Sequence, residues 1–292
     1  MNFKRFAVMF TLASVLASGA HAQLKTKEIV LKKSNTLVMN KEFTSDVTAQ
    51  LAVAAKKMDE SLSSSEEIYL VLDTPGGSIS AGLELIENLN NLKHKVNTIT
   101  IFSASMGFQT AQQLKGARYI VDRGTLMSHK ARGRFEGEFP GQLDQRYRYF
   151  LGVVTELDQR VAARSGGKHD LKSYQALVEN EYWCGPEDCA KQGFVDAKAA
   201  VSCDKSLSGT HDEVVDEASF LGMTLQLIAT FADCPTITSP LALKDKIDGQ
   251  PEEKVIHKLS RDQKEFLFGI KQKTLSNLIT KNRKVVYYSE IK

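Results

Sequence analysis

No cysteine precedes Cys184 in this 292-residue chain, and no apolar run reaches the roughly 20 residues that a transmembrane helix requires. An excess of one charge is lacking too, because 38 Lys and Arg residues oppose 35 Asp and Glu residues. That balance gives no electrostatic case for nucleic-acid binding. The phosphate-binding pattern Gly-x-x-x-x-Gly-Lys-Ser/Thr is also absent. We therefore expect no integral membrane span, no nucleic-acid partner and no P-loop nucleotide site.

The N-terminus has the pattern of a cleavable signal peptide. Lys4 and Arg5 precede an apolar stretch at residues 6–16, and a small-residue Ala-His-Ala sequence ends at Ala22. We expect cleavage after Ala22, so that residues 1–22 form the signal peptide. With no cysteine near that point, a lipid anchor is not expected. The predicted location is the bacterial periplasm or the medium beyond it.

The four cysteines all lie in the C-terminal half of the chain. In an exported protein, an even number of cysteines predicts disulfide bonds. The pairing most consistent with sequence order is Cys184 with Cys189 and Cys203 with Cys234. A zinc site is the rival, but the first pair is spaced more widely than Cys-x2-Cys and no histidine cluster accompanies it. We expect no metal and no organic cofactor.

Two short motifs, each directly after a β-branched apolar run, carry the clearest chemical signal. The run at residues 68–72 predicts a buried strand, and Asp-Thr-Pro-Gly-Gly-Ser follows it at 73–78. The glycines let backbone N–H groups approach a substrate closely. The run at 96–102 predicts the next strand, and Ser-Ala-Ser-Met-Gly follows at 103–107. Ser105 would then lie at a helix N-terminus, whose free N–H groups suit an alkoxide or a developing oxyanion.

A third motif offers a base. The apolar run at residues 119–121 is followed within ten residues by Leu-Met-Ser-His at 126–129. Serine is a weak nucleophile at neutral pH and needs a neighbouring base, and the unperturbed pKa of histidine lies nearest that pH. Ser105 and His129 are therefore the candidate nucleophile and base.

The order Pro-Gly-Gly, Ala-Ser-Met-Gly and Met-Ser-His resembles the Clp-type serine peptidases of the ClpP/crotonase superfamily, over residues 28–200. The closing segment at 185–196, Gly-Pro-Glu-Asp-Cys-Ala-Lys-Gln-Gly-Phe-Val-Asp, is similar to that family's Pro-Glu-x-Ala-x-x-x-Gly-Leu-Val-Asp. The roles that the resemblance implies are nucleophile for Ser105, general base for His129, and oxyanion-hole N–H donors for Gly76 and Met106.

The chain departs from this family at the third catalytic residue, an aspartate that orients the histidine. Alignment on Pro186 places Ala176 or Leu177 near that position, and neither side chain can accept a hydrogen bond. We favour Glu179 as the replacement; the other candidates are Asn180, Glu181 and, further off, Asp170. A Ser–His dyad alone would still be competent, because loss of the acid lowers activity without abolishing it.

Lys130 is an alternative base, because membrane-associated peptidases of the same superfamily use a Ser–Lys dyad. Neighbouring residues of a strand point to opposite faces, so His129 and Lys130 would not both face Ser105 unless the segment is a loop. His129 matches the family motif and Lys130 does not. We therefore rank Lys130 second and interpret it as a surface charge.

Alternating strand and helix patterns predict an α/β fold over residues 23–203. The resemblance implies a ClpP/crotonase-like fold of repeated ββα units, with a mainly parallel sheet covered by helices. Residues 142–165 have the spacing of a long helix, which contributes to assembly in this family. Residues 204–292 form a C-terminal extension, which we expect to be mostly helical, including 212–232, with a terminal strand at 285–288.

The function we expect is that of an exported serine endopeptidase, which cleaves peptides or unfolded chains and forms a homo-oligomer. An ATP-driven unfoldase partner is not expected, because nucleoside triphosphates are not available outside the cytoplasm. A crotonase-like acyl-CoA enzyme is one rival, but it would need cytoplasmic CoA. A catalytically silent ClpP-like binding or assembly protein is another, suggested by the missing aspartate.

Overall fold

The computed structural model describes residues 24–247 apart from 139 and 221–222. The expected signal peptide at 1–22 and the expected terminal strand at 285–288 lie outside the described residues.

The main sheet has seven strands in the order β1-β7-β5-β4-β3-β2, with β6 paired to β5. All pairs along this order are parallel, and β6 is antiparallel to β5. The sheet is thus mainly parallel, as predicted. Its strands are β1 (Thr26–Leu31), β2 (Thr36–Met39), β3 (Ile68–Thr74), β4 (Val96–Ala104), β5 (Arg118–Ser128), β6 (Tyr182–Cys184) and β7 (Ala197–Cys203).

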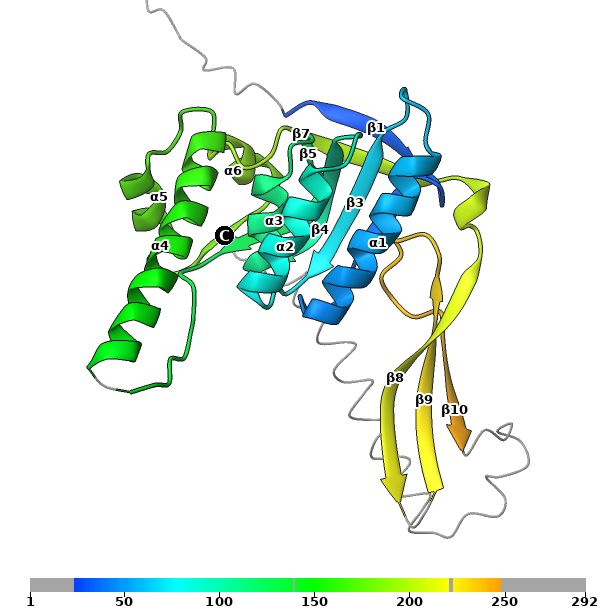
Figure 1. The fold of residues 1–292 in the computed structure, drawn as a ribbon. Helices are drawn as coiled ribbons and strands as arrows, with labels where there is room; N and C mark the ends of the chain where they lie inside the picture. The colour runs from blue at the N-terminus through cyan, green and yellow to red at the C-terminus, as the bar shows by residue number, and fades with distance from the viewer. Residues whose placement is uncertain (1–23, 139, 221–222, 248–292) are drawn as a thin grey trace, which may run out of the picture.

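The helices gather on one face and one side of this sheet. Figure 1 shows α1, α2 and α3 in front of the sheet, with α4 and α5 beyond α3. The long helix expected at residues 142–165 is α4. The helices are α1 (Ser45–Ser61), α2 (Ile79–Asn90), α3 (Met106–Gln113), α4 (Gly141–Arg164), α5 (Leu171–Leu177) and α6 (Pro186–Lys191), with a 3-10 turn η1 (Lys205–Leu207).

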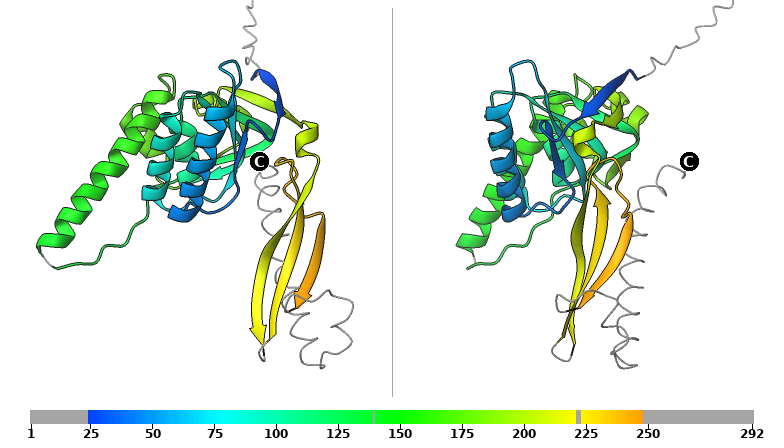
Figure 2. Two further views of the ribbon diagram at one scale, coloured as in Figure 1. Left: turned by 45° about the vertical axis from the view of Figure 1, so that its right-hand side comes forward. Right: turned by 90° about the vertical axis from the view of Figure 1, so that its right-hand side faces the viewer.

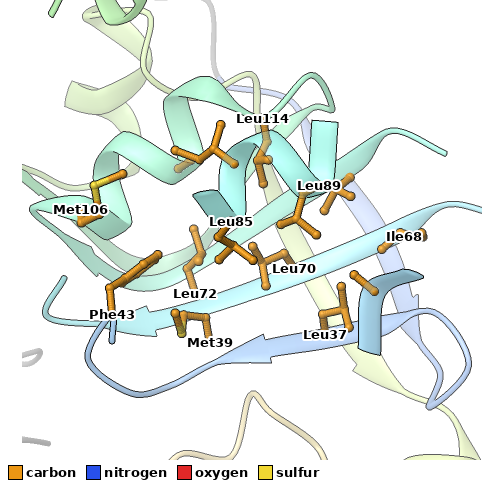
Figure 3. Close-up of a cluster of buried hydrophobic side chains, with 14 residues drawn as sticks. Leu37, Met39, Phe43, Ile68, Leu70, Leu72, Leu85, Leu89, Met106 and Leu114 are labelled. Atoms are coloured by element: carbon orange, nitrogen blue, oxygen red, sulfur yellow. The ribbon is translucent and has the colours of Figure 1, made fainter. Parts of the chain in front are cut away.

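Both faces of strand β3, which lies between β4 and β2, are buried, which explains its unbroken apolar run. Leu70 and Leu72 pack with α1 and α2 in the core cluster of Figure 3. Tyr69 and Val71 point to the other face, where they pack with residues of β1, β4, β5 and β7. The strands that lead to the candidate motifs are therefore fixed on both sides.

A buried cation holds the closing segment of the fold. The Arg118 side chain at the start of β5 is 7% exposed, and its Nη2 and Nε donate to Asp196 at 2.6 and 3.2 Å. Its Nη1 donates to the carbonyl of Gly193 at 2.8 Å and to Gln112 Oε1 at 2.7 Å. The Gly-Phe-Val-Asp sequence that ends the family-like segment therefore anchors the chain to β5 and supplies no catalytic group.

The start of the C-terminal extension is an antiparallel sheet of three strands, β8 (Thr210–Phe220), β9 (Met223–Ala232) and β10 (Ala242–Ile247). We call it the arm. Figures 1 and 2 show it extending away from the main sheet. Its contacts with the rest of the chain include the Cys203–Cys234 disulfide and an ion pair between Lys41 and Glu213 at 2.9 Å.

The helix expected at residues 212–232 was wrong, because residues 212–220 lie in β8 and residues 223–232 lie in β9. Leu227 and Ala229 are both buried although they are two positions apart. That spacing puts side chains on one face of a strand but on nearly opposite sides of a helix. The number of apolar residues alone does not distinguish a helix from a strand, whereas this two-residue spacing does.

The structure pairs Cys184 with Cys189 and Cys203 with Cys234, which is the pairing that sequence order favoured. The first disulfide joins β6 to α6, beside the end of β5. The second joins the end of β7 to the segment after β9, and so fixes the base of the arm.

Candidate active site

Ser105 lies in the turn between the end of β4 and the start of α3. Its φ of 55° and ψ of −115° place it in a positive-φ conformation, which costs a non-glycine residue about 1–3 kcal/mol. Its side chain makes no capping hydrogen bond to α3. A serine that served only to begin the helix would be expected to cap it. The Ser105 hydroxyl therefore does not cap α3, and it remains available to a substrate.

The backbone of Gly76, in the Pro-Gly-Gly motif after β3, lies directly against this turn. A Cβ atom on Gly76 would lie 2.6 Å from the carbonyl oxygen of Ala104, 2.7 Å from Ser105 Cβ and 2.8 Å from Met106 N. The φ of Gly76 is 96°, which also favours glycine. Its N–H donates to Thr74 Oγ1 at 3.1 Å, so a substrate oxyanion would compete with that hydroxyl for the donor.

Met106 begins α3 and supplies the second backbone N–H at the turn. The first N–H groups of a helix have no partner within the helix, and they carry its partial positive charge. The Met106 side chain is 2% exposed, packs against Gly82 of α2 and lies near Phe43 in the core cluster (Figure 3). This anchor holds the N–H of Met106 beside Gly76, which is the arrangement that an oxyanion hole needs.

His129 directly follows β5, the strand next to β4. The two strands are parallel, Ala104 is opposite Met127, and Ser105 N donates to the Met127 carbonyl at 3.0 Å. Ser105 and His129 therefore leave the sheet at the same edge from adjacent strands. The half-buried His129 side chain makes no hydrogen bond to any described residue. Catalytic contacts are often long in free enzymes and shorten when substrate binds.

Tyr174 contacts the end of β5 just before His129, and sequence patterns did not single it out. Its hydroxyl shares a 2.8 Å hydrogen bond with the hydroxyl of Ser128, the last residue of β5, and both side chains are buried. Burial raises the pKa of Tyr174, so its hydroxyl stays protonated. The contact fixes the residue immediately before His129. The one sequence feature that could have indicated this role is a tyrosine, Tyr174, at a helix position that faces the core.

Glu179, the favoured orienting acid, forms an ion pair with Lys130. Its described partner is therefore the residue after His129 and not the histidine. Both side chains of this pair are more than half exposed, at 56% for Lys130 and 58% for Glu179. Lys130, the alternative base, is thus an exposed side chain that pairs with a carboxylate.

The other candidate acids also contact groups other than the histidine. Glu181 pairs with Arg132 at 3.0 Å, and Asp170 caps α5 by accepting from Ser173 N at 2.7 Å. Asn180 is exposed. Within residues 24–247, leaving out 139 and 221–222, no carboxylate contacts the imidazole. The structure places Ser105 against the backbone of Gly76 and Met106, and it places His129 directly after the adjacent strand, at the same edge of the sheet.

In the part of the chain that the structure describes, no group of three His, Cys, Asp or Glu side chains is placed to hold a metal ion. None of the described helices is both long and apolar enough to cross a bilayer.

A mainly parallel α/β sheet with this serine turn at its carboxyl edge defines a ClpP-like fold. A family model described as Clp protease matches residues 18–200, which include all four candidate site residues. The chain therefore belongs to the Clp protease family. It is 32% identical over 155 residues to the ATP-dependent Clp protease proteolytic subunit of Streptococcus gordonii, across 52% of this chain and 78% of that protein. The arm lies beyond the family match.

Proposed function

We propose that this chain is an exported serine endopeptidase that cleaves peptide bonds through an acyl-enzyme on Ser105. The observation that carries the proposal is the strained turn. It places Ser105 against the backbone of Gly76 and Met106, while His129 leaves the adjacent strand at the same edge.

In this mechanism His129 removes the Ser105 proton as Oγ attacks the scissile carbonyl carbon. The carbonyl oxygen becomes an oxyanion, which accepts hydrogen bonds from the N–H groups of Gly76 and Met106. Imidazolium then donates its proton to the leaving amine as the C–N bond breaks. A water molecule, deprotonated by His129, attacks the acyl group, and the carboxylic acid leaves as Ser105 regains its proton.

The base in this proposal works without a contacting carboxylate. Such a dyad keeps part of the activity of a triad, because the acid orients the histidine but does not take its proton. Lys130 is a weaker candidate for the base. Its side chain is exposed and pairs with Glu179, whereas His129 matches the family motif.

Export is supported by the signal-like pattern at residues 1–22 and by two disulfides, which form in oxidising compartments. Outside the cytoplasm no ATP-driven partner would feed the site, so we propose peptides and unfolded chains as substrates. The relative from Streptococcus gordonii is named as ATP-dependent; this chain is proposed to act without ATP.

Self-association through α4 is part of the proposal. Three large side chains of this helix are exposed: Tyr147 at 53%, Tyr149 at 77% and Leu151 at 48%. Figure 2 shows α4 reaching beyond the rest of the core. Exposed apolar groups gathered on one element favour an interface between copies of the chain.

A catalytically silent binding protein is the second candidate. The observation that favours it is the lack of any carboxylate against His129 among the described residues. Such a protein would keep the fold and bind peptides without cleaving them.

Hydrolysis of a mixed peptide library separates these functions. We expect Ser105→Ala and His129→Ala each to remove most activity, and the double variant to be no slower than either single one, because both changes disable the same nucleophile. Lys130→Ala should retain near-normal turnover. Full activity in His129→Ala, or a double variant far below both single ones, would contradict the proposal.

A further inference from the structure

A cavity of about 760 Å³ lies between the segment that follows His129 and the helices α4 and α5. The residues of its wall that matter here are Lys130, Phe135, Phe150, Asp158, Gln175 and Glu179. Lys130 directly follows His129 in the chain, so the cavity adjoins the segment that carries the candidate base.

One wall of the cavity is aromatic. The Phe135 ring packs edge-on against Phe150 at 5.2 Å between centroids and against Tyr147 at 6.3 Å. Leu151 and Val154 extend the apolar surface along α4. Such a wall suits an aliphatic stem, and its ring faces also attract a cation.

The carboxylate of Asp158, also in the lining, has no cation against it among the described residues. Its described partner is Gln175, whose Nε2 donates to Oδ2 at 3.0 Å. Burial raises the pKa of Asp158, and the Gln175 hydrogen bond offsets this only in part. A partly desolvated carboxylate with a single neutral donor would gain from a cationic partner.

The lysines of the cavity do not satisfy this carboxylate. Lys130 is paired with Glu179, and Lys172 is exposed. Asp158 is therefore a carboxylate of the lining that has no cationic partner among the described residues.

We propose that this cavity receives a lysine or arginine side chain next to the scissile bond, with Asp158 binding the cationic head and the Phe135, Tyr147 and Phe150 wall holding the stem. Asp158 is then a specificity-determining residue of the proposed peptidase, and the inference rests on that function. A purely apolar side chain would use the aromatic wall but leave the carboxylate without a cationic partner.

The test in the active protein uses matched peptides with Lys, Arg or Leu at each position flanking the scissile bond. We expect Asp158→Asn to lower kcat/KM for the preferred Lys and Arg peptides at least tenfold, with little change for the Leu peptides. Glu156→Gln is the control, because Glu156 is an exposed acid on the same helix, paired with Arg160. An unchanged Lys and Arg preference in Asp158→Asn, or a wild-type preference for Leu, would overturn the inference.

A binding measurement separates failure of the inference from failure of the proposed function. The fluorescent aryl cation p-aminobenzamidine should bind the full mature chain carrying Ser105→Ala, and adding Asp158→Asn should weaken its Kd at least tenfold. Adding Glu156→Gln should not. Equal binding to the Asp158 and control variants, or no binding to any, contradicts the cation pocket. Binding as expected without peptide hydrolysis by wild type supports the pocket and contradicts the peptidase.

Discussion

Tyr174 and Ser128 share a buried hydrogen bond of 2.8 Å immediately behind His129. Ser128 ends β5, and Tyr174 comes from α5, so the contact joins the strand that carries the candidate base to a helix of the neighbouring cluster. With one side of β5 fixed in this way, the position of His129 depends on the packing of α5. The helix therefore has a role in the site although none of its residues contacts the histidine.

Replacement of Tyr174 by phenylalanine should lower both stability and turnover. The change leaves the buried Ser128 hydroxyl without a partner, which costs about 1–3 kcal/mol of unfolding free energy. We expect kcat to fall more than KM rises, since the substrate-binding backbone is untouched. Urea unfolding and steady-state kinetics measure the two effects. Tyr69→Phe, which removes a hydroxyl hydrogen bond to Glu67 near the start of β3, is the control; equal kinetics in both variants would show that Tyr174 does not position the base.

Replacement of Gly76 by alanine should remove activity while the protein stays folded. The new Cβ would lie within 2.8 Å of Met106 N and Ser105 Cβ, so the two N–H donors could not keep their places. Loss of an oxyanion-hole donor costs about 10²–10³-fold in kcat. Gly152→Ala is the control, because a Cβ at that α4 position meets nothing within 4 Å. Retention of more than a tenth of wild-type kcat in Gly76→Ala would argue against this oxyanion hole.

The buried pair His94 and Asp59 should make stability depend on pH. The ring Nδ1 of His94 lies 2.7 Å from the Asp59 carboxylate, and this hydrogen bond raises the pKa of His94 above its usual 6.5. Stabilisation by His94 is then complete below the unfolded pKa and is lost as pH rises through the higher folded pKa. Burial raises the pKa of Asp59, but hydrogen bonds from His94 and Lys93 lower it overall, so its contribution is lost only in acid.

We expect His94→Gln to cost more unfolding free energy at about pH 5.5 than at about pH 9. Chemical unfolding at several pH values measures the difference. In an Asp59→Asn background the same substitution should show no such trend. A cost that does not change with pH in the wild-type background would contradict a charged pair.

The disulfide between Cys203 and Cys234 should stabilise the arm. It closes a loop with a sequence separation of 31, and a loop of that length corresponds to about 3–4 kcal/mol of unfolding free energy. The variant Cys203→Ser/Cys234→Ser should unfold at lower urea concentration, and its arm should be cleaved sooner in limited proteolysis. Thiol titration of denatured, unreduced wild type should find no free thiol. Two or more thiols per chain would contradict the pairing.

Local sequence patterns predicted the elements that surround the serine turn, because apolar strands and their following turns are set by nearby residues. They failed for residues 212–232, where β8 pairs with β9 through a hairpin whose register no local count reveals. They also could not place Glu179. Its partner Lys130 lies far from it in the sequence, so only the packed fold brings the two side chains together. The sequence did not single out Asp158, because its place in the cavity depends on how α4 packs against α5.

Labelling by a fluorophosphonate probe, followed by peptide mass mapping, tests the central claim most directly. The account predicts one adduct on Ser105 in the mature wild-type chain and none on that peptide in Ser105→Ala. It predicts a rate lower by about 10²–10⁴-fold in His129→Ala, the usual contribution of a general base. An unlabelled wild-type chain, a label on another residue, or an unchanged rate in His129→Ala would contradict it.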